Sequence, residues 1–448
     1  MSRDFFGTDG VRGRVGADPM TADFAMRLAS AAAQVLVPKG GTVVIGKDTR
    51  LSGYMFESAL EAGYVAAGAD VLLLGPLPTP GIARLTQEFD ADLGVVISAS
   101  HNLFFDNGIK FFDAQGSKLS DEVEQQIEER LREPAITLES QSLGKAKRID
   151  SARIRYEVFC AASLPQGMDL TGLKIVFDGA NGAGYKVGPR TLGNLGADVI
   201  PIGCSPNGKN INAGCGSTHP ELMQLTVPAV KADVGVALDG DGDRVVMTDE
   251  NGELIDGDQL LYVLATSRKE QGSLPGPVVG TVMSNLGLEH ALQARDIEFR
   301  RTAVGDRYVL EALRDSGGVL GGETSGHMLV LDKTTTGDGL ISALQVLAVM
   351  KQTGRPLSEL VKGMPKYPQT MVNVRMEHRL DPDASPQIQD AVAVAEQELA
   401  NTGRVVLRAS GTEPVIRVMV EGEDEKQVVS LAERLASVVS EAARQIGQ

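Results

Sequence analysis

Three stretches of this chain repeat one order of sequence signals, and this repetition limits the folds that the chain can adopt. Each stretch has an apolar strand with a Gly-rich turn, a helical pattern, a second strand, and a third strand that ends in a polar loop. The predicted first strands are residues 42–46, 173–178 and 277–281. Strands that alternate with helices in a repeated order predict three similar α/β domains, with largely parallel sheets covered on both faces.

The third strand of each repeat leads directly into polar residues. Residues 92–97 lead into Ser98, residues 233–238 into Asp239, and residues 317–320 into Gly321. Ligands of open α/β sheets bind at the carboxyl ends of the strands. We therefore expect the three polar loops to converge on one cleft.

The pattern changes after residue 368. It becomes a strand (371–376), a helix (385–399), two strands (405–408 and 415–420) and a helix (425–443), which predicts a smaller α+β domain. A chain of 448 residues is too long for one hydrophobic core. The predicted fold is three mixed, largely parallel α/β domains and a C-terminal α+β domain around one central cleft. The expected boundaries are 1–150, 151–254, 255–366 and 367–448.

Composition and charge narrow the classes of partner. The formal net charge of -16 would repel a nucleic-acid backbone. Neither a signal segment nor an apolar run of roughly 20 residues is present, so we expect no membrane partner. Three cysteines without C-x-x-C spacing favour reduced thiols, and hence a cytoplasmic protein.

The loop LDGDGDR at residues 238–244 places Asp239, Asp241 and Asp243 at every second position, with glycines between them. In an extended loop this spacing points the three carboxylates the same way. Hard oxygen ligands with open positions suit Mg²⁺. The same spacing begins an EF-hand, but Arg244 stands where that loop requires Gly, and the flanking residues predict strands.

Other loops offer weaker signals. GGETSGH at residues 321–327 suits hydrogen bonds to a polyol, and RASGTEP at 408–414 with Arg417 has the parts of a phosphate-binding nest. Residues 41–47 have the Gly and Lys spacing of the start of a P-loop, but the TVVI between the glycines predicts a strand. Residues 47–50 could line the cleft or form a solvated turn. Arg12 and Lys110, in Gly-rich turns, are by themselves most simply surface charges.

Together, the serine loop SASHN at residues 98–102 and the three other loops, one for each domain, resemble the α-D-phosphohexomutase superfamily. The resemblance covers the whole chain in the family's order. FGTDGVRG (6–13), DNGIK (106–110) and TTTGDG (334–339) look most like its bacterial phosphoglucosamine mutase branch. That branch interconverts glucosamine 6-phosphate and glucosamine 1-phosphate through a phosphoserine and a glucosamine 1,6-bisphosphate, on the route to UDP-N-acetylglucosamine and the cell wall.

The resemblance also implies roles for individual residues. Ser100 would carry a phosphoryl group and, with the three Asp carboxylates, would hold Mg²⁺. Arg12, His101 and Lys110 would assist catalysis, with Lys110 as general base or acid. The expected substrate-binding residues are Arg244, Glu323, Ser325, His327, Arg408, Ser410, Gly411, Thr412 and Arg417. A homodimer is expected at the level of the family.

Three alternatives stay open from the residues alone. A phosphomannomutase or phosphoglucomutase would carry the same loops, because the sequence shows no recognition of a 2-amino group. A Mg²⁺-dependent sugar phosphatase would use the same metal loop, and a phosphosugar sensor would bind without catalysis. Leu103 departs from the family, which usually has Pro after the Asn of the serine loop, and this departure predicts a looser loop.

Overall fold

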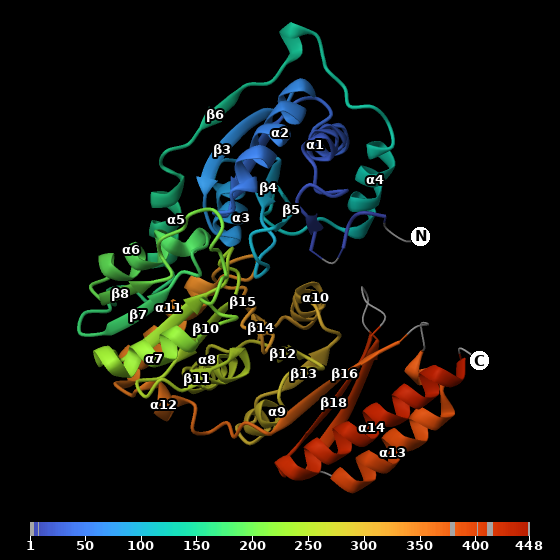
Figure 1. Cartoon of the computed structure of the whole chain (residues 1–448). Helices are drawn as coiled ribbons and strands as arrows, with labels where there is room; N and C mark the ends of the chain where they lie inside the picture. The colour runs from blue at the N-terminus through green and yellow to red at the C-terminus, as the bar shows by residue number, and fades with distance from the viewer. Residues whose placement is uncertain (1–3, 8, 377–380, 401, 410–414, 447–448) are drawn as a thin grey trace. The chain divides into compact units, whose positions relative to one another are not determined.

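The four predicted groups of strands form four sheets in the computed structural model, which describes residues 4–7, 9–376, 381–400, 402–409 and 415–446 (Figure 1). The chain divides into two compact units. The first comprises Met1–Val279 and Gly305–Val361, and the second comprises Gly280–Val304 and Lys362–Gln448. The four domain boundaries expected from the sequence remain a prediction.

The first sheet has the strand order β1-β5-β4-β2-β3-β6. Its strands are β1 (Val11–Arg14), β2 (Thr42–Lys47), β3 (Asp70–Pro76), β4 (Leu93–Ile97), β5 (Asp106–Asp113) and β6 (Ala146–Arg148). Strands β2, β3, β4 and β6 run parallel, whereas β5 is antiparallel to both β1 and β4. All five residues of β4 are buried, as expected for a strand covered on both faces.

Helices cover both faces of this sheet. Residues of α1 (Ala22–Leu36), α2 (Ser52–Ala66) and α4 (Asp121–Leu131) share one core with Val43 and Ile45 of β2. Helix α3 (Thr79–Glu88) lies on the opposite face, where Ile82 and Thr86 approach Gly46 and Gly94. The first repeat is therefore a three-layer α/β/α structure.

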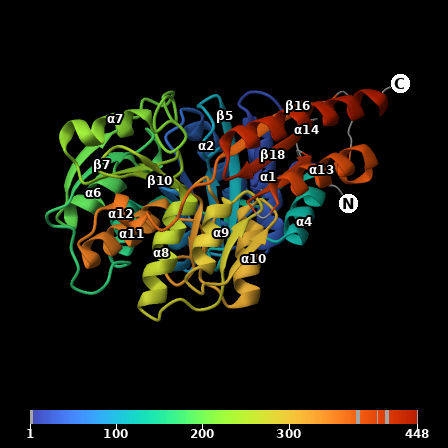
Figure 2. The same cartoon turned by 90° about the horizontal axis from the view of Figure 1, so that it is seen from below.

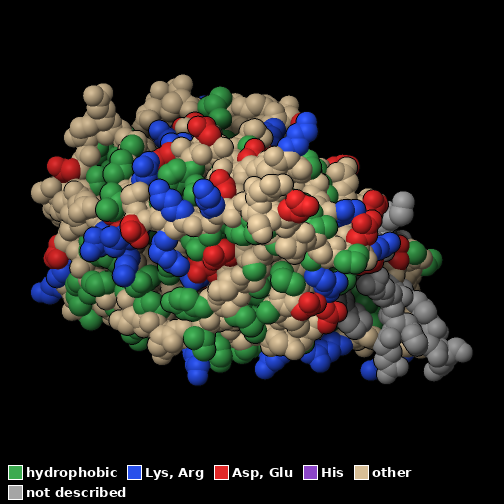
Figure 3. Space-filling model, turned by 90° about the horizontal axis from the view of Figure 1, so that it is seen from above, with side chains coloured by type: hydrophobic (Ala, Val, Ile, Leu, Met, Phe, Trp, Pro, Cys, Tyr) green, Lys and Arg blue, Asp and Glu red, His purple; other side chains and the backbone are tan. Residues whose placement is uncertain are grey.

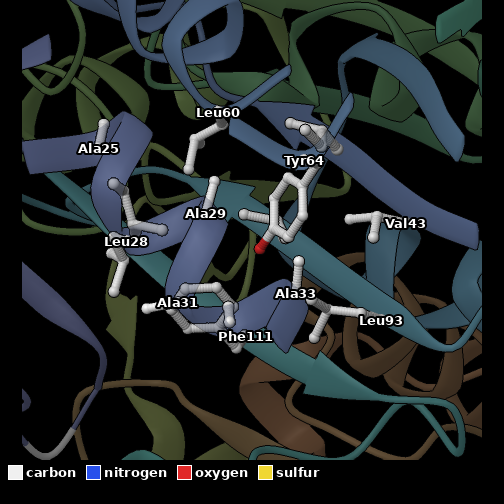
Figure 4. Packing of buried hydrophobic residues seen from close by; sticks show 14 of the residues in the cluster. Ala25, Leu28, Ala29, Ala31, Ala33, Val43, Leu60, Tyr64, Leu93 and Phe111 are labelled. Carbon is white, nitrogen blue, oxygen red and sulfur yellow. The ribbon is translucent and has the colours of Figure 1, made fainter. Parts of the chain in front are cut away.

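The core between α1 and α2 depends on small side chains. Figure 4 shows the Tyr64 ring of α2 beside Ala29 and Ala33 of the alanine-rich α1. A Cβ atom at Gly63 would stand only 2.4 Å from the carbonyl oxygen of Met26. The two helices can approach this closely because residue 63 has no side chain.

The second sheet repeats the order of the first. Its order is β11-β10-β9-β7-β8, from β7 (Lys174–Asp178), β8 (Asp198–Ile202), β9 (Val234–Leu238), β10 (Val245–Thr248) and β11 (Leu254–Ile255). The helices of this region are η2 (Ala183–Tyr185), α5 (Ala152–Ala161), α6 (Val187–Asn194) and α7 (Glu221–Val230), and η1 (Ser140–Ser142) precedes them. Both sheets place the first strand of the repeat beside the second and third, and a fourth, antiparallel strand beside the third.

The third repeat keeps the pairing of its first, third and fourth strands. Strand β12 (Val278–Thr281) is parallel to β14 (Leu320–Gly322), which pairs antiparallel with β15 (Met328–Val330). Its helices are α8 (Gly257–Glu270), α10 (Asp306–Ser316), α11 (Gly339–Thr353) and α12 (Leu357–Leu360). The repeat predicted from the sequence is therefore confirmed in the fold.

The second unit contains the predicted α+β region. It begins with α9 (Leu286–Gln293) and β13 (Phe299–Thr302), and continues with β16 (Gln369–Arg375), η3 (Pro382–Ala384), α13 (Pro386–Leu399), β17 (Gly403–Ala409), β18 (Val415–Gly422) and α14 (Glu425–Ile446). The antiparallel sheet β16-β18-β17 carries α13 and α14 side by side, as Figures 1 and 2 show. The predicted change of pattern after residue 368 is confirmed.

On the face seen in Figure 3, basic and acidic side chains are interspersed with apolar ones. Cys160, Cys204 and Cys215 are free thiols. Among the described residues, no helix combines the length and the apolar character needed to cross a membrane.

Candidate active site

Ser100 lies in the loop between β4 and β5, at the carboxyl end of β4. Its backbone has φ of 49°, in the left-handed region, and the residue is 2% exposed. The Ser100 hydroxyl donates to Asp239 Oδ2 at 2.6 Å. The structure thus brings the serine loop of the first repeat to the acidic loop of the second.

The three carboxylates of the acidic loop lie together in the turn between β9 and β10. One oxygen from each of Asp239, Asp241 and Asp243 lies within 4.8 Å of the others, and all three residues are buried. Gly242, with φ of 73°, lets the backbone turn so tightly.

This cluster has the donor set of a metal site. Asp241 Oδ1 and Asp243 Oδ1 are buried and accept no hydrogen bond from the residues that the structure describes. Burial and the charges of Asp243 and Asp241 raise the pKa of Asp239. Buried carboxylates of this kind need a cation, and hard oxygen ligands fit a divalent one.

Lys110 supplies one cation from β5. Its Nζ atom lies 2.9 Å from Asp241 Oδ2, 2.9 Å from Asp9 Oδ2 and 3.7 Å from Asp243 Oδ2. Burial alone would lower the pKa of Lys110, but Asp241 and Asp9 raise it, so the side chain stays charged. The interpretation of residues 107–110 as a turn with a surface lysine was wrong, because Lys110 is 2% exposed within a strand.

Arg12 lies at the edge of this charged cluster, on β1. Its guanidinium pairs with Asp9, and its side chain is 28% exposed. A second lysine, Lys118, also pairs with Asp9, at 2.6 Å. Three cations therefore surround one carboxylate, and together they hold the pKa of Asp9 well below its usual value despite burial.

His101 follows the serine directly. Its Nδ1 atom lies 3.4 Å from Ser100 Oγ. Burial lowers the pKa of His101 to about 4, and the charges of Arg244 and Arg12 lower it in the same direction. The imidazole is therefore neutral near pH 7.

The loop predicted to bind a polyol connects β14 and β15. Glu323 accepts a hydrogen bond from the Gly305 amide at 3.1 Å, and Ser325 is exposed. His327 is buried, with Nδ1 3.7 Å from Asp243 and Nε2 3.4 Å from Asp306. Burial would lower the pKa of His327, but these two carboxylates raise it to about 9.

Arg244 connects the acidic loop with the polyol loop. Its amide donates to Asp239 Oδ1 at 3.2 Å, and its backbone forms a β-bridge with His327. Burial opposes the charge of Arg244, but Asp243, Asp239 and Glu323 raise its pKa. The loops of all three repeats therefore meet in the first unit.

The predicted phosphate-binding loop belongs to the second unit. Arg408 on β17 and Arg417 on β18 are direct cross-strand partners, so both side chains stand on one face of the sheet. Ser410, Gly411 and Thr412 lie outside the described residues.

Four residues near the cluster escaped the sequence analysis. The Thr79 hydroxyl donates to Asp241 Oδ2 at 2.7 Å, and Lys118 Nζ lies 2.6 Å from Asp306 Oδ2. Asp9 lies inside the FGTDGVRG segment, three positions before Arg12, and this closeness could have suggested Asp9 as a site residue. Thr79 and Lys118 carry no local signal, because the contacts Thr79–Asp241 and Lys118–Asp306 join residues more than 100 positions apart.

Four family models match the chain in succession, all described as phosphoglucomutase/phosphomannomutase. The alpha/beta/alpha domain I model matches residues 3–136, domain II matches 161–252, domain III matches 256–367, and the C-terminal domain matches 371–438.

Similar proteins extend over the whole length. A phosphoglucosamine mutase of Thioalkalivibrio sulfidiphilus is 56% identical over 451 residues, covering 100% of both chains. One of Aeromonas hydrophila is 56% identical, covering 99% of this chain and 100% of its own. A phosphoglucomutase/phosphomannomutase family structure from Burkholderia thailandensis has a TM-score of 0.81 at 23% identity, covering 98% of this chain and 97% of that chain.

A fungal structure has a similar fold at lower identity. It is the Aspergillus fumigatus N-acetylphosphoglucosamine mutase, whose complex contains GlcNAc-6P and magnesium. Its TM-score is 0.70 at 18% identity, and the match covers 98% of this chain and 96% of that chain.

Proposed function

Because this chain belongs to the phosphoglucomutase/phosphomannomutase family, we propose that it interconverts glucosamine 6-phosphate and glucosamine 1-phosphate. The relatives at 54–56% identity named phosphoglucosamine mutase support the amino sugar as substrate. The observation that carries the mutase chemistry is the 2.6 Å contact between Ser100 Oγ and the carboxylate cluster.

The reaction proceeds by two phosphoryl transfers. In the first, the P–Oγ bond of phosphorylated Ser100 breaks and a bond forms to O1 of the 6-phosphate sugar. The O1 hydroxyl loses its proton, and Ser100 Oγ gains one. The product is glucosamine 1,6-bisphosphate, which turns in the site. In the second, the P–O6 bond breaks, Ser100 Oγ loses its proton and recovers the phosphoryl group, and O6 gains a proton. The same bisphosphate also rephosphorylates a serine that has lost its group.

Cations make these transfers feasible beside buried carboxylates. A phosphoryl group on Ser100 would add negative charge next to Asp239, and Lys110 and Arg12 offset part of that charge. Asp239, Asp241 and Asp243 would hold Mg²⁺, with the phosphoryl group on Ser100 as a further ligand. When bound, the metal supplies positive charge that stabilises the transferring group.

Proton transfer falls to side chains next to the serine. His101 Nδ1, 3.4 Å from Ser100 Oγ, is placed to exchange the hydroxyl proton as the serine gains or loses its phosphoryl group. Lys110, held among three carboxylates, acts as a fixed positive charge or as an acid.

Substrate binding uses the remaining candidates. Glu323 and Ser325 bind sugar hydroxyls, His327 lies between this loop and the cluster, and Arg244 holds the two loops together. Arg408 and Arg417, with Ser410, Gly411 and Thr412, bind the phosphate that does not react. We place the protein in the cytoplasm, where its three thiols would stay reduced, and we expect a homodimer.

The reaction can be followed by ³¹P NMR. The protein is incubated with Mg²⁺, a trace of the bisphosphate, and the 6-phosphate of glucosamine, glucose or mannose in turn. Fastest formation of a sugar 1-phosphate from glucosamine 6-phosphate is expected. A faster reaction with glucose or mannose phosphate would instead favour a phosphoglucomutase or phosphomannomutase, and free phosphate alone would favour a phosphatase.

Ser100→Ala is the decisive variant. Intact mass should show a phosphoryl group on the purified wild-type protein and none on the variant, whose mutase activity should fall to background. Arg355→Ala, which removes an exposed cation paired with Glu359, is the control and should keep both properties. Wild-type activity in Ser100→Ala would refute the mechanism.

A further inference from the structure

From the sequence, residues 47–50 could either line the cleft or form a solvated turn. The structure excludes a solvated turn, because Lys47, Asp48 and Arg50 are buried. Arg50 follows β2 and has 0% of its surface exposed. Its guanidinium pairs with Asp48 and donates to the carbonyl oxygens of Ser100, at 3.2 Å, and Asn102. A fully buried charge is costly unless it is paired and hydrogen-bonded. The ion pair with Asp48 and the two carbonyl hydrogen bonds meet this requirement for Arg50.

The Asp48 side of this ion pair reaches the same loop by another route. The Ser98 hydroxyl donates to Asp48 Oδ2 at 2.6 Å, and Ser98 Oγ accepts from the Ser100 amide at 2.9 Å. One buried ion pair therefore holds residue 100 through its carbonyl and, by way of Ser98, through its amide.

A third segment completes the contacts. The side-chain amide of Asn212, between β8 and α7, donates to the carbonyl oxygens of Ser100 and Asn102, at 2.9 Å each. The same two carbonyls thus receive donors from Arg50 and from Asn212, which are 162 positions apart in the sequence. Left-handed backbone at a residue other than Gly persists only where its surroundings hold it, and Ser100 has such backbone.

We propose that Arg50 is a positioning residue for phosphoryl transfer, acting with Asp48 and Asn212. It holds Ser100 in the left-handed conformation that aims Oγ at Asp239. Arg50 also fixes the carbonyl of Asn102, next to Leu103, where the family usually has the ring of a proline. The proposal rests on the proposed function for its catalytic consequence, but the positioning itself can be measured without activity.

The first variant is Arg50→Lys. Lysine keeps the positive charge beside Asp48 but lacks the planar fork that reaches both carbonyls. Because a misplacement of about 1 Å can cost on the order of 100-fold in rate, we expect kcat to fall roughly 10- to 100-fold. KM for the phosphosugar should stay within about twofold, because Arg50 is not placed at the substrate.

The second variant, Asn212→Gly, removes the other donor. The backbone of Asn212 has φ of 57°, which Gly adopts without strain, so this variant is expected to fold even where Arg50→Lys does not. Glu57→Gln is the matched control. It disrupts a second buried ion pair, Lys47–Glu57, whose lysine is the last residue of β2, the strand that Arg50 follows.

The readout that does not need activity is amide hydrogen exchange, followed by mass spectrometry of peptides covering residues 98–106. Exchange should accelerate at least about tenfold in Arg50→Lys and Asn212→Gly, and stay at the wild-type rate in Glu57→Gln. If exchange is faster in these two variants but the wild type has no mutase activity, the positioning role of Arg50 is supported and the proposed function is rejected.

Three results would overturn the proposal. The first is unchanged exchange in both folded variants. The second is faster exchange with wild-type kcat, which would show that the hold on the loop has no catalytic consequence. The third is an equal loss of kcat in Glu57→Gln, which would assign the effect to general loss of stability.

Discussion

At the scale of single residues, the backbone of Ser100 restricts the side chain that can stand there. Its φ of 49° suits Gly and is rare for other residues, and it is most unfavourable for β-branched ones. Threonine has the same nucleophilic group as serine but is β-branched. The conformation of the loop therefore distinguishes two side chains that are chemically alike.

Ser100→Thr tests this restriction. We expect the free energy of unfolding to fall by about 1–3 kcal/mol, the strain of a β-branched residue in this region, and the phosphoryl content to drop. Intact mass and urea unfolding followed by circular dichroism would measure both. A threonine variant that is phosphorylated and active like the wild type would show that the loop adapts.

At the scale of secondary-structure elements, the register of β17 and β18 places Arg408 opposite Arg417. Like charges directly opposite each other are unfavourable without an anion between them. The proposed phosphate ligand explains why both are cations.

Arg417→Ala should therefore raise KM about 10- to 150-fold, since a hydrogen bond to a charged group contributes about 1.5–3 kcal/mol. The phosphoryl content of Ser100 should not change. Steady-state kinetics and intact mass check both statements, with Arg434→Ala, an exposed cation on α14, as the control. An unchanged KM would remove Arg417 from the phosphate site.

The start of helix α11 contains a buried titratable side chain, Asp338. Asp338 caps the helix by accepting from the Ile341 amide at 2.9 Å, and it accepts from the Tyr156 hydroxyl at 2.8 Å. Burial raises the pKa of Asp338 from 3.8 to about 6. The unfolded carboxyl thus ionises first as the pH rises.

This difference predicts a pH dependence. Between pH 3.8 and 6 only the unfolded chain has lost the proton, so rising pH favours unfolding; above pH 6 both states are ionised and the effect is constant. The group alone should destabilise the fold by about 3 kcal/mol across this window. In Asp338→Asn that part of the slope should vanish, as urea unfolding at several pH values would show. Parallel curves for the two proteins would contradict the assignment.

At this scale, the sequence predicted those elements whose signals come from residues that are close together along the chain. The strands expected on both sides of the LDGDGDR loop coincide with β9 and β10, because the Gly and Asp residues between them mark the turn. Strand β5 was misread, because Asn107 and Lys110 are polar and yet buried. Lys110 is tolerated there because carboxylates distant in the sequence compensate its charge, among them Asp241, 131 positions away.

At the scale of the whole molecule, the site is assembled from distant segments. The repeat predicted that the polar loops after corresponding strands converge, and the contact between Ser100 and Asp239 agrees with this prediction. The pairs Lys118–Asp306 and His327–Asp243 could not be inferred, because no local pattern encodes which side chain from another repeat will face them.

The carboxylate cluster predicts that metal removal affects stability as well as activity. A cation at about 100 times its dissociation constant would add about 2.7 kcal/mol to the free energy of unfolding. Chelation should lower the unfolding temperature of the wild type and abolish activity, and Mg²⁺ should restore both.

Asp241→Asn should weaken this response, as thermal unfolding with and without Mg²⁺ would measure. Asp332→Asn, a partly exposed acid paired with Arg268, is the control and should respond like the wild type. Identical curves for the wild type with chelator and with Mg²⁺ would exclude a structural role for the ion.

The contacts of Asn212 with the serine loop also bear on how such enzymes can recombine. A chimera that took residues 1–150 from a relative would replace Ser100, Arg50 and Asp48 with that relative's residues, but would keep Asn212 and Asp239 of this chain. The reactive loop of such a hybrid would meet a foreign support on one side. The smallest portion of this chain that can be exchanged while preserving the serine's surroundings therefore extends past the first repeat, at least through residue 243.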